Sequence, residues 1–246
     1  MLLPVLFAFL TFVSTLLGGL TALRNSKHLH KILGYTAGVI LGLIAFDLLP
    51  EIFEIVEHQQ IDATWPMVAL VAGFLLFHIV EKSIAIHHAH DSEYKDHTHP
   101  HVGQASALAL IGHSFLDGVG IGLGFQAGEG VGIAVAIAVI AHDFADGLNT
   151  VTLMLAHRNN RRRSVIMLIL AAFAPVLGAL STLFFSLNEG ALVLYLGFFT
   201  GFLLYIGASD ILPQAHSKKS TKSTIALTVL GVVFMFVVTR LVGHSH

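Results

Sequence analysis

Two copies of one short pattern carry the residues of this chain that could do chemistry. The pattern reads His-x-Phe-x-Asp-Gly, and it occurs as His113–Gly118 and again as His142–Gly147. The histidine and the carboxylate stand four residues apart in each copy, so on a helix both side chains share one face. An imidazole beside a carboxylate supplies the nitrogen and oxygen ligands of zinc and other divalent transition metals. Asp143, directly after the second histidine, adds another carboxylate.

Both copies lie in sequence too apolar for anything but a membrane helix. The chain is 55% hydrophobic and 11% charged, with a mean hydropathy of +0.80, which excludes an ordinary soluble globular domain. Ionisable groups in hydrocarbon are costly unless they are compensated, so they point to an ion pathway or a binding site. The alternative, in which they only hydrogen-bond to one another between packed helices, suits a single histidine better than a pattern repeated in register.

Eight apolar stretches predict an all-α polytopic membrane protein. Each stretch has about the 20 residues that a helix needs to cross the hydrocarbon of a bilayer. Residues 1–246 therefore form a single transmembrane domain with little chain left for a soluble one. The stretches are Leu2–Leu23, Ile32–Pro50, Pro66–Ile86, Gln104–Phe125, Val131–Ala156, Ser164–Leu187, Gly190–Pro213 and Thr224–Val242.

Lysine and arginine predict the orientation in the membrane. Twelve of the 13 basic residues fall in the connections after the first, third, fifth and seventh stretches. By the positive-inside rule these connections are cytoplasmic, so both termini lie outside the cytoplasm. We expect a cell membrane, plasma or inner. The net charge of −2 gives no reason to expect nucleic acid as a partner, and the absence of cysteine excludes thiolate ligands.

A second repetition indicates an inverted architecture. Asp47-Leu-Leu-Pro50 is expected to end the second helix and Asp210-Ile-Leu-Pro213 the seventh. The midpoint between these copies coincides with the midpoint between the two histidine motifs. The chain is therefore predicted to be organised as 3+2+3 helices with a pseudo-two-fold axis in the membrane plane, a pattern found in secondary transporters with a site near the midplane.

Small residues single out the two stretches that carry the histidine motifs. Such residues let helix backbones approach closely. We therefore expect these two helices to form the packed centre of the protein. The small residues are Gly112, Gly118, Gly120, Gly122 and Gly124 in the first stretch, and Ala134, Ala136, Ala138, Ala141 and Ala145 in the second.

Taken together, these features resemble the ZIP (zinc/iron-regulated transporter-like) family of divalent metal transporters. The resemblance spans the chain: eight helices with outer termini, a His-rich third cytoplasmic loop, an H-x-x-x-[E/D]-G signature in helices four and five, and the Asp-hydrophobic-hydrophobic-Pro motifs. It implies a metal between helices four and five, with help from helices two and seven. The implied main ligands are His113, Asp117, His142 and Asp146. Asp143 would serve a second metal position, and Asp210, Asp47 and Ser114 complete the implied set.

Several residues depart from the usual family motifs, which are close to HNFPEG and HxxPEG. Ser114 replaces an asparagine, and Asp117 and Asp146 replace glutamates. Aspartate is one methylene shorter than glutamate, with about 1.5 Å less reach. A carboxylate that bridges two metals in relatives is therefore expected to bind one here, so the first metal position is better supported than the second.

The predicted third cytoplasmic loop, residues 87–103, is rich in histidine. Neutral imidazoles bind zinc, copper and nickel, so this loop is predicted to buffer or sense metal. The alternative is a solvated linker that binds metal only incidentally. Its histidines are His87, His88, His90, His97, His99 and His101.

The predicted function is transport of a divalent cation into the cytoplasm. Zinc is the expected substrate, with Fe²⁺, Mn²⁺ and Cd²⁺ as alternatives, and the lipid bilayer is the other expected partner. No nucleotide-binding motif occurs, so a metal gradient, the membrane potential or a coupled ion must drive transport. The alternative is an intramembrane zinc-dependent hydrolase. A surplus of ligands and an inverted repeat favour the transporter, so we expect no enzyme activity. Whether the protein forms a homodimer is left open.

Overall fold

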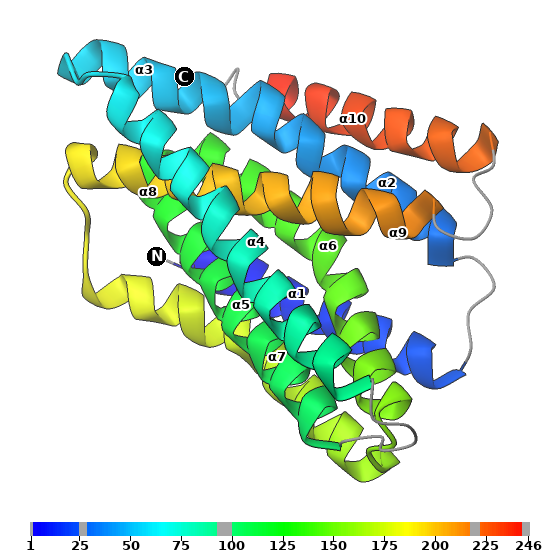
Figure 1. The fold of residues 1–246 in the computed structure, drawn as a ribbon. Coiled ribbons are helices and arrows are strands. Elements are labelled where there is room, and N and C mark those ends of the chain that lie inside the picture. The colour runs from blue at the N-terminus through cyan, green and yellow to red at the C-terminus, as the bar shows by residue number, and fades with distance from the viewer. Residues whose placement is uncertain (1, 25–28, 93–99, 217–221, 243–246) are drawn as a thin grey trace.

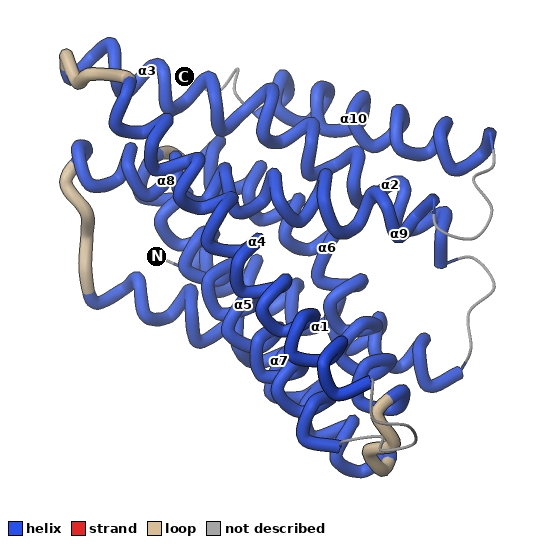
Figure 2. Tube along the Cα trace, viewed as in Figure 1, coloured by secondary structure: helices blue, strands red, loops and turns tan. Residues whose placement is uncertain are grey.

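The fold is built from helices that run alongside one another (Figures 1 and 2). This computed structural model describes residues 2–24, 29–92, 100–216 and 222–242. Within those ranges all regular secondary structure is helical and no strand occurs. The all-α prediction is therefore confirmed.

Ten α-helices follow one another along the described chain, with two π-helical segments and one 3-10 turn. Six of the helices are long and apolar enough to cross a membrane, namely α1, α5, α6, α7, α8 and α10. The stretches predicted at 32–50 and 66–86 form α2 with the first π-helical segment and the apolar part of α4, and they are not among those six. The elements are α1 (Leu2–Arg24), α2 (Leu29–Leu43), η1 (Ile44–Leu48), α3 (Leu49–Gln59), α4 (Thr64–Ser92), α5 (Pro100–Ala127), α6 (Glu129–Ala156), α7 (Arg161–Ser181), η2 (Thr182–Phe184), α8 (Glu189–Leu204), η3 (Tyr205–Ile211), α9 (Leu212–His216) and α10 (Lys222–Val242).

The prediction that the two Asp-hydrophobic-hydrophobic-Pro motifs end their helices is wrong. Asp47 lies in the π-helical segment η1, and the chain then continues as α3 with Pro50 in its first turn. Asp210 lies in η3, and α9 follows. Proline lacks an N–H and disrupts α-helical hydrogen bonding in a helix interior, but it is tolerated in a first turn. A π-helical turn before the proline lets the helix pass the residue without stopping.

The helices form two packed groups. In the first group α1 packs on α6 and α7, and α5 packs on the same two helices; in the second, α2 packs on α10 and α4 on α8. In Figure 1, α2 and α10 lie in the upper part of the picture, and α1 and α7 in the lower part. The groups meet chiefly where α2 approaches α6. Both histidine motifs belong to the first group.

The expectation that α5 and α6 form the packed centre holds for α6 and only partly for α5. The alanines of α6 at 134, 136, 138 and 145 are fully buried. However, α8 is more deeply buried than α5, which exposes Leu108 and Phe115. The glycines of α5 mainly bring it against α7, because a Cβ at Gly118 would overlap the carbonyl oxygen of Pro175.

Side-chain caps explain where three helices begin. Asn160 and Asn188 accept hydrogen bonds from the backbone N–H three residues on, at 2.8 and 2.9 Å, at the starts of α7 and α8. The carboxylate of Asp62 accepts from the Thr64 N–H at 2.9 Å, and this bond lowers the pKa of Asp62. Each cap satisfies a backbone donor that has no partner within its helix.

The two glycines Gly118 and Gly112 provide a matched test of the packing between α5 and α7. Gly118→Ala should destabilise the protein by about 1–3 kcal/mol, because the added methyl group overlaps backbone that cannot move out of its way. Gly112→Ala is the control on the same helix, since nothing lies within 4 Å of its Cβ position. Thermal unfolding of both variants in detergent measures the difference. Equal midpoints would contradict the packing described.

Candidate metal centre

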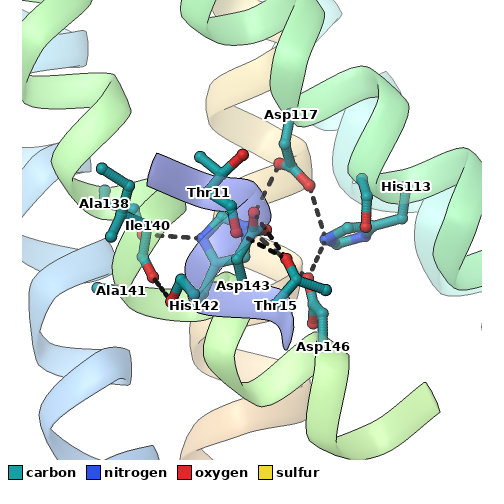
Figure 3. Close-up of polar contacts among 12 residues, drawn as sticks. Thr11, Thr15, His113, Asp117, Ala138, Ile140, Ala141, His142, Asp143 and Asp146 are labelled. Carbon is teal, nitrogen blue, oxygen red and sulfur yellow. Dashed lines mark hydrogen bonds and ion pairs between the residues drawn. The ribbon is translucent and has the colours of Figure 1, made fainter. Parts of the chain in front are cut away.

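The two histidine motifs face each other across the contact between α5 and α6 (Figure 3). His113 and Asp117 come from α5, and His142 and Asp146 come from α6. One ligating atom from each of the four residues lies within 4.8 Å of the other three. Packing of the two helices thus brings together pairs that stand far apart in sequence.

Each imidazole lies between both carboxylates. The Nε2 atom of His113 lies 3.1 Å from an oxygen of Asp117 and 3.2 Å from an oxygen of Asp146. The Nε2 atom of His142 lies 3.4 Å from the other oxygen of Asp117 and 4.0 Å from Asp146. Ligands that hold a tetrahedral zinc at about 2.0–2.2 Å are themselves about 3.3–3.6 Å apart. The four side chains therefore have the spacing of a divalent metal site.

The cluster is buried, and its imidazole nitrogens and carboxylate oxygens have chiefly one another as polar neighbours. Asp117 and His142 are fully buried, and His113 and Asp146 are 9% and 4% exposed. No hydrogen-bond partner is found among the described residues for either Nε2 atom, for the two oxygens of Asp117 or for Oδ2 of Asp146. When the imidazoles are neutral, nitrogen and carboxylate lone pairs face one another at 3.1–3.4 Å, which is unfavourable in a buried site. A cation bound between these atoms would compensate them.

The orientation of His142 is set by a backbone carbonyl. Its Nδ1 lies 3.0 Å from the carbonyl oxygen of Ala138, one turn earlier in α6. A carbonyl only accepts hydrogen bonds, so this contact requires the proton on Nδ1. In the neutral imidazole that a metal needs, the lone pair of Nε2 then points to the carboxylates.

Asp143 lies at the edge of the cluster, on the side of α1. One of its oxygens lies 3.3 Å from the Thr15 hydroxyl of α1, whose single proton also has the Thr11 carbonyl oxygen as an acceptor at 3.0 Å, and the other lies 3.9 Å from Nε2 of His142. Sequence reasoning missed Thr15. Its only signal is a set of hydroxyls in an otherwise apolar stretch, where Ser14 also bonds a carbonyl of α6, that of Ile140, at 2.7 Å.

Ser114 and Asp47 are the remaining sequence candidates whose side chains the structure describes. Ser114 is buried and donates to the carbonyl of Leu110 in its own helix at 3.1 Å, a common use of a helical serine. Asp47 carries one buried oxygen without a hydrogen-bond partner among the described residues. The side chain of Asp210 and those of the six His-rich-loop histidines lie outside the described part of the structure. The prediction that residues 87–103 form a loop is wrong at both ends, because the backbone at 87–92 continues α4 and that at 100–103 begins α5.

A family model described as ZIP zinc transporter matches residues 87–239. That range covers more than half of the chain and contains both histidine motifs. The chain belongs to the ZIP family. A search of curated proteins found no match.

Membership of the ZIP family decides the class of this protein. ZIP proteins are transporters of divalent metals rather than enzymes, so the assignment favours transport over the hydrolase alternative. Together with the six apolar helices, it makes the chain an integral membrane protein.

Protons should compete with metal for the two histidines of this ZIP protein. An imidazole must be neutral to ligate, and it ordinarily takes up a proton near pH 6.5, so zinc affinity should fall from about pH 7 to about pH 5. Equilibrium zinc binding by the purified protein measures this fall. His142→Ala should lower the affinity and flatten its pH dependence, because one competing proton is lost. A His113→Ala/His142→Ala variant measures the zinc binding that comes from other histidines. If the wild-type affinity above that background did not change with pH, neither His113 nor His142 would be a ligand.

Proposed function

We propose that this protein carries zinc across a cell membrane into the cytoplasm through the cluster formed by His113, Asp117, His142 and Asp146. The observation that supports this is a buried set of unsatisfied ligand atoms shared by two apolar helices. A buried imidazole and carboxylate set without thiolates suits Zn²⁺, and it also admits Fe²⁺, Mn²⁺ and Cd²⁺. Asp143, Asp47, Asp210 and Ser114 are proposed as residues that the ion meets beside this cluster.

We further propose that the chain crosses the membrane eight times, as a 3+2+3 inverted repeat with both termini outside. Support comes from Figure 1, where the first turn of α1 and the last turn of α10 both lie toward the left. The paired π-helical segments at Asp47 and Asp210 also support the repeat. In this orientation the exposed arginines at the start of α7 face the cytoplasm.

In the proposed transport cycle the metal gradient, the membrane potential or a coupled ion supplies the driving force. The ion sheds its water on the outer side, is held by the two histidines and two aspartates, and is released inward when the two helix groups rearrange. When the metal ion enters the buried site, the four side chains replace its bound water. The charge of the ion in turn compensates the cost of burying these side chains. The cluster is complete within one copy of the chain, so the proposal does not depend on a dimer.

Loss of one ligand should abolish transport. His142→Ala is expected to reduce uptake of labelled zinc into vesicles to background, while the protein folds and inserts normally. His58→Ala is the matched control, because His58 is an exposed histidine near the end of α3. Uptake at the wild-type rate in His142→Ala would contradict the proposed site. Labelled Fe²⁺, Mn²⁺ and Cd²⁺ in the same assay compare the substrates.

The His-rich loop is proposed to tune transport rather than to carry it. Replacing its six histidines by serine keeps the length of the connection and removes the imidazoles. Basal zinc uptake should persist, with a changed apparent affinity or a changed response to metal, since these histidines lie beyond the apolar parts of α4 (64–80) and α5 (103–127). Complete loss of uptake in a folded variant would show instead that the loop is part of the route.

A further inference from the structure

The two histidines of the cluster are held in different ways. The ring of His142 is anchored by the Ala138 carbonyl in its own helix. His113 has polar partners only at Nε2, where the two carboxylates approach it, and no hydrogen bond from its Nδ1 is found among the described residues. Something other than a hydrogen bond must therefore fix the plane of the His113 ring.

Two phenylalanines pack on this ring. The ring centroid of Phe202 lies 4.7 Å from that of His113 with an interplanar angle of 67°, and that of Phe77 lies 6.2 Å away with an angle of 84°. The two phenylalanine rings are themselves 4.1 Å apart. The two contacts with His113 are edge-to-face arrangements, which have a preferred geometry because the edge and face of an aromatic ring carry opposite partial charge. Phe202 is fully buried, so its ring is enclosed by neighbouring side chains.

The phenylalanines and the ligands belong to different groups of helices. His113 and its carboxylate partners come from α5 and α6, whereas Phe77 comes from α4 and Phe202 from α8. The orientation of this one ligand therefore depends on how α4 and α8 are placed against α5. The anchor of His142 lies within α6 and has no such dependence.

We propose that Phe202, backed by Phe77, is a positioning residue that holds the His113 imidazole in its metal-binding orientation and couples it to the placement of α4 and α8. This inference rests on the proposed role of the cluster in binding zinc. It assigns His113 as the ligand that loses its orientation first when the two helix groups shift. His142 and the carboxylates then retain the ion until it leaves.

Phe199 provides a control that distinguishes a positioning role of Phe202 from ordinary core packing. It stands on the same helix as Phe202, is equally buried at 1% exposure, and stacks on Tyr195 and against Phe202. No ring contact between Phe199 and His113 is found in the described structure. Phe199→Leu therefore removes a ring from the same cluster without touching a ligand.

The test is a double-mutant cycle on zinc binding by the full-length purified protein. Phe202→Leu should weaken equilibrium Zn²⁺ affinity by roughly tenfold, as loss of a residue that orients a metal ligand commonly does. His113→Ala should weaken it as well. If Phe202 acts through His113, the double variant should bind no more weakly than His113→Ala alone, because the two substitutions remove the same interaction. Phe199→Leu should leave the affinity unchanged, and binding by His113→Ala/His142→Ala is subtracted as background.

The outcomes distinguish this inference from the function on which it rests. No change of affinity in His113→Ala would overturn the proposed site itself. A loss in His113→Ala with none in Phe202→Leu, or losses that multiply in the double variant, would overturn the role of Phe202 alone. An equal loss of zinc affinity in Phe199→Leu would show that the effect of Phe202→Leu comes from general packing and would also overturn the role of Phe202. If Phe202→Leu does not fold, the half-buried Phe77 replaces it in the cycle as Phe77→Leu. The same comparisons of single and double variants then test the proposal.

Discussion

The need to compensate imidazoles and carboxylates buried between membrane helices constrains the rest of this structure. The Nε2 atoms of His113 and His142 and the oxygens of Asp117 converge without hydrogen-bond partners in the described chain. In a low-dielectric interior such atoms need an opposite charge or a donor, and a divalent cation suits a set of lone pairs that point inward. The contact between α5 and α6 and the tautomer of His142 follow from that requirement, since both serve to bring lone pairs to one point.

Small residues behind the ligand helices make this convergence possible. A Cβ at Gly118 would overlap the Pro175 carbonyl of α7, and one at Gly147 would overlap the Thr15 carbonyl of α1. Each glycine directly follows a cluster aspartate, so the closest backbone approach occurs next to the ligand. The helices α1 and α7 therefore fix the positions of the carboxylates from behind. The Thr15 hydroxyl of α1 also lies beside Asp143, at 3.3 Å from one of its oxygens.

The two motifs are alike in sequence and different in their surroundings. The position after each histidine holds Ser114 in one copy, which bonds back to its own helix, and Asp143 in the other, which reaches α1. One histidine is oriented by a carbonyl of its own helix and the other by rings from α4 and α8. A site with one locally fixed ligand and one ligand fixed by a second group of helices can respond to movement between the groups. That difference is a physical basis for binding and release at one place.

The sequence by itself determined the class of the protein and the ligand pairs within each helix. Apolar composition predicted an all-α membrane protein, and the i, i+4 spacing predicted that His113 lies beside Asp117, because helical periodicity is a local property. Only the tertiary structure decided that His113 also meets Asp146, that the Thr15 hydroxyl lies beside Asp143 and that α5 packs on α7 as well as on α6. These depend on which surfaces fit together between segments distant in sequence. A spacing rule within one helix carries no information on that fit.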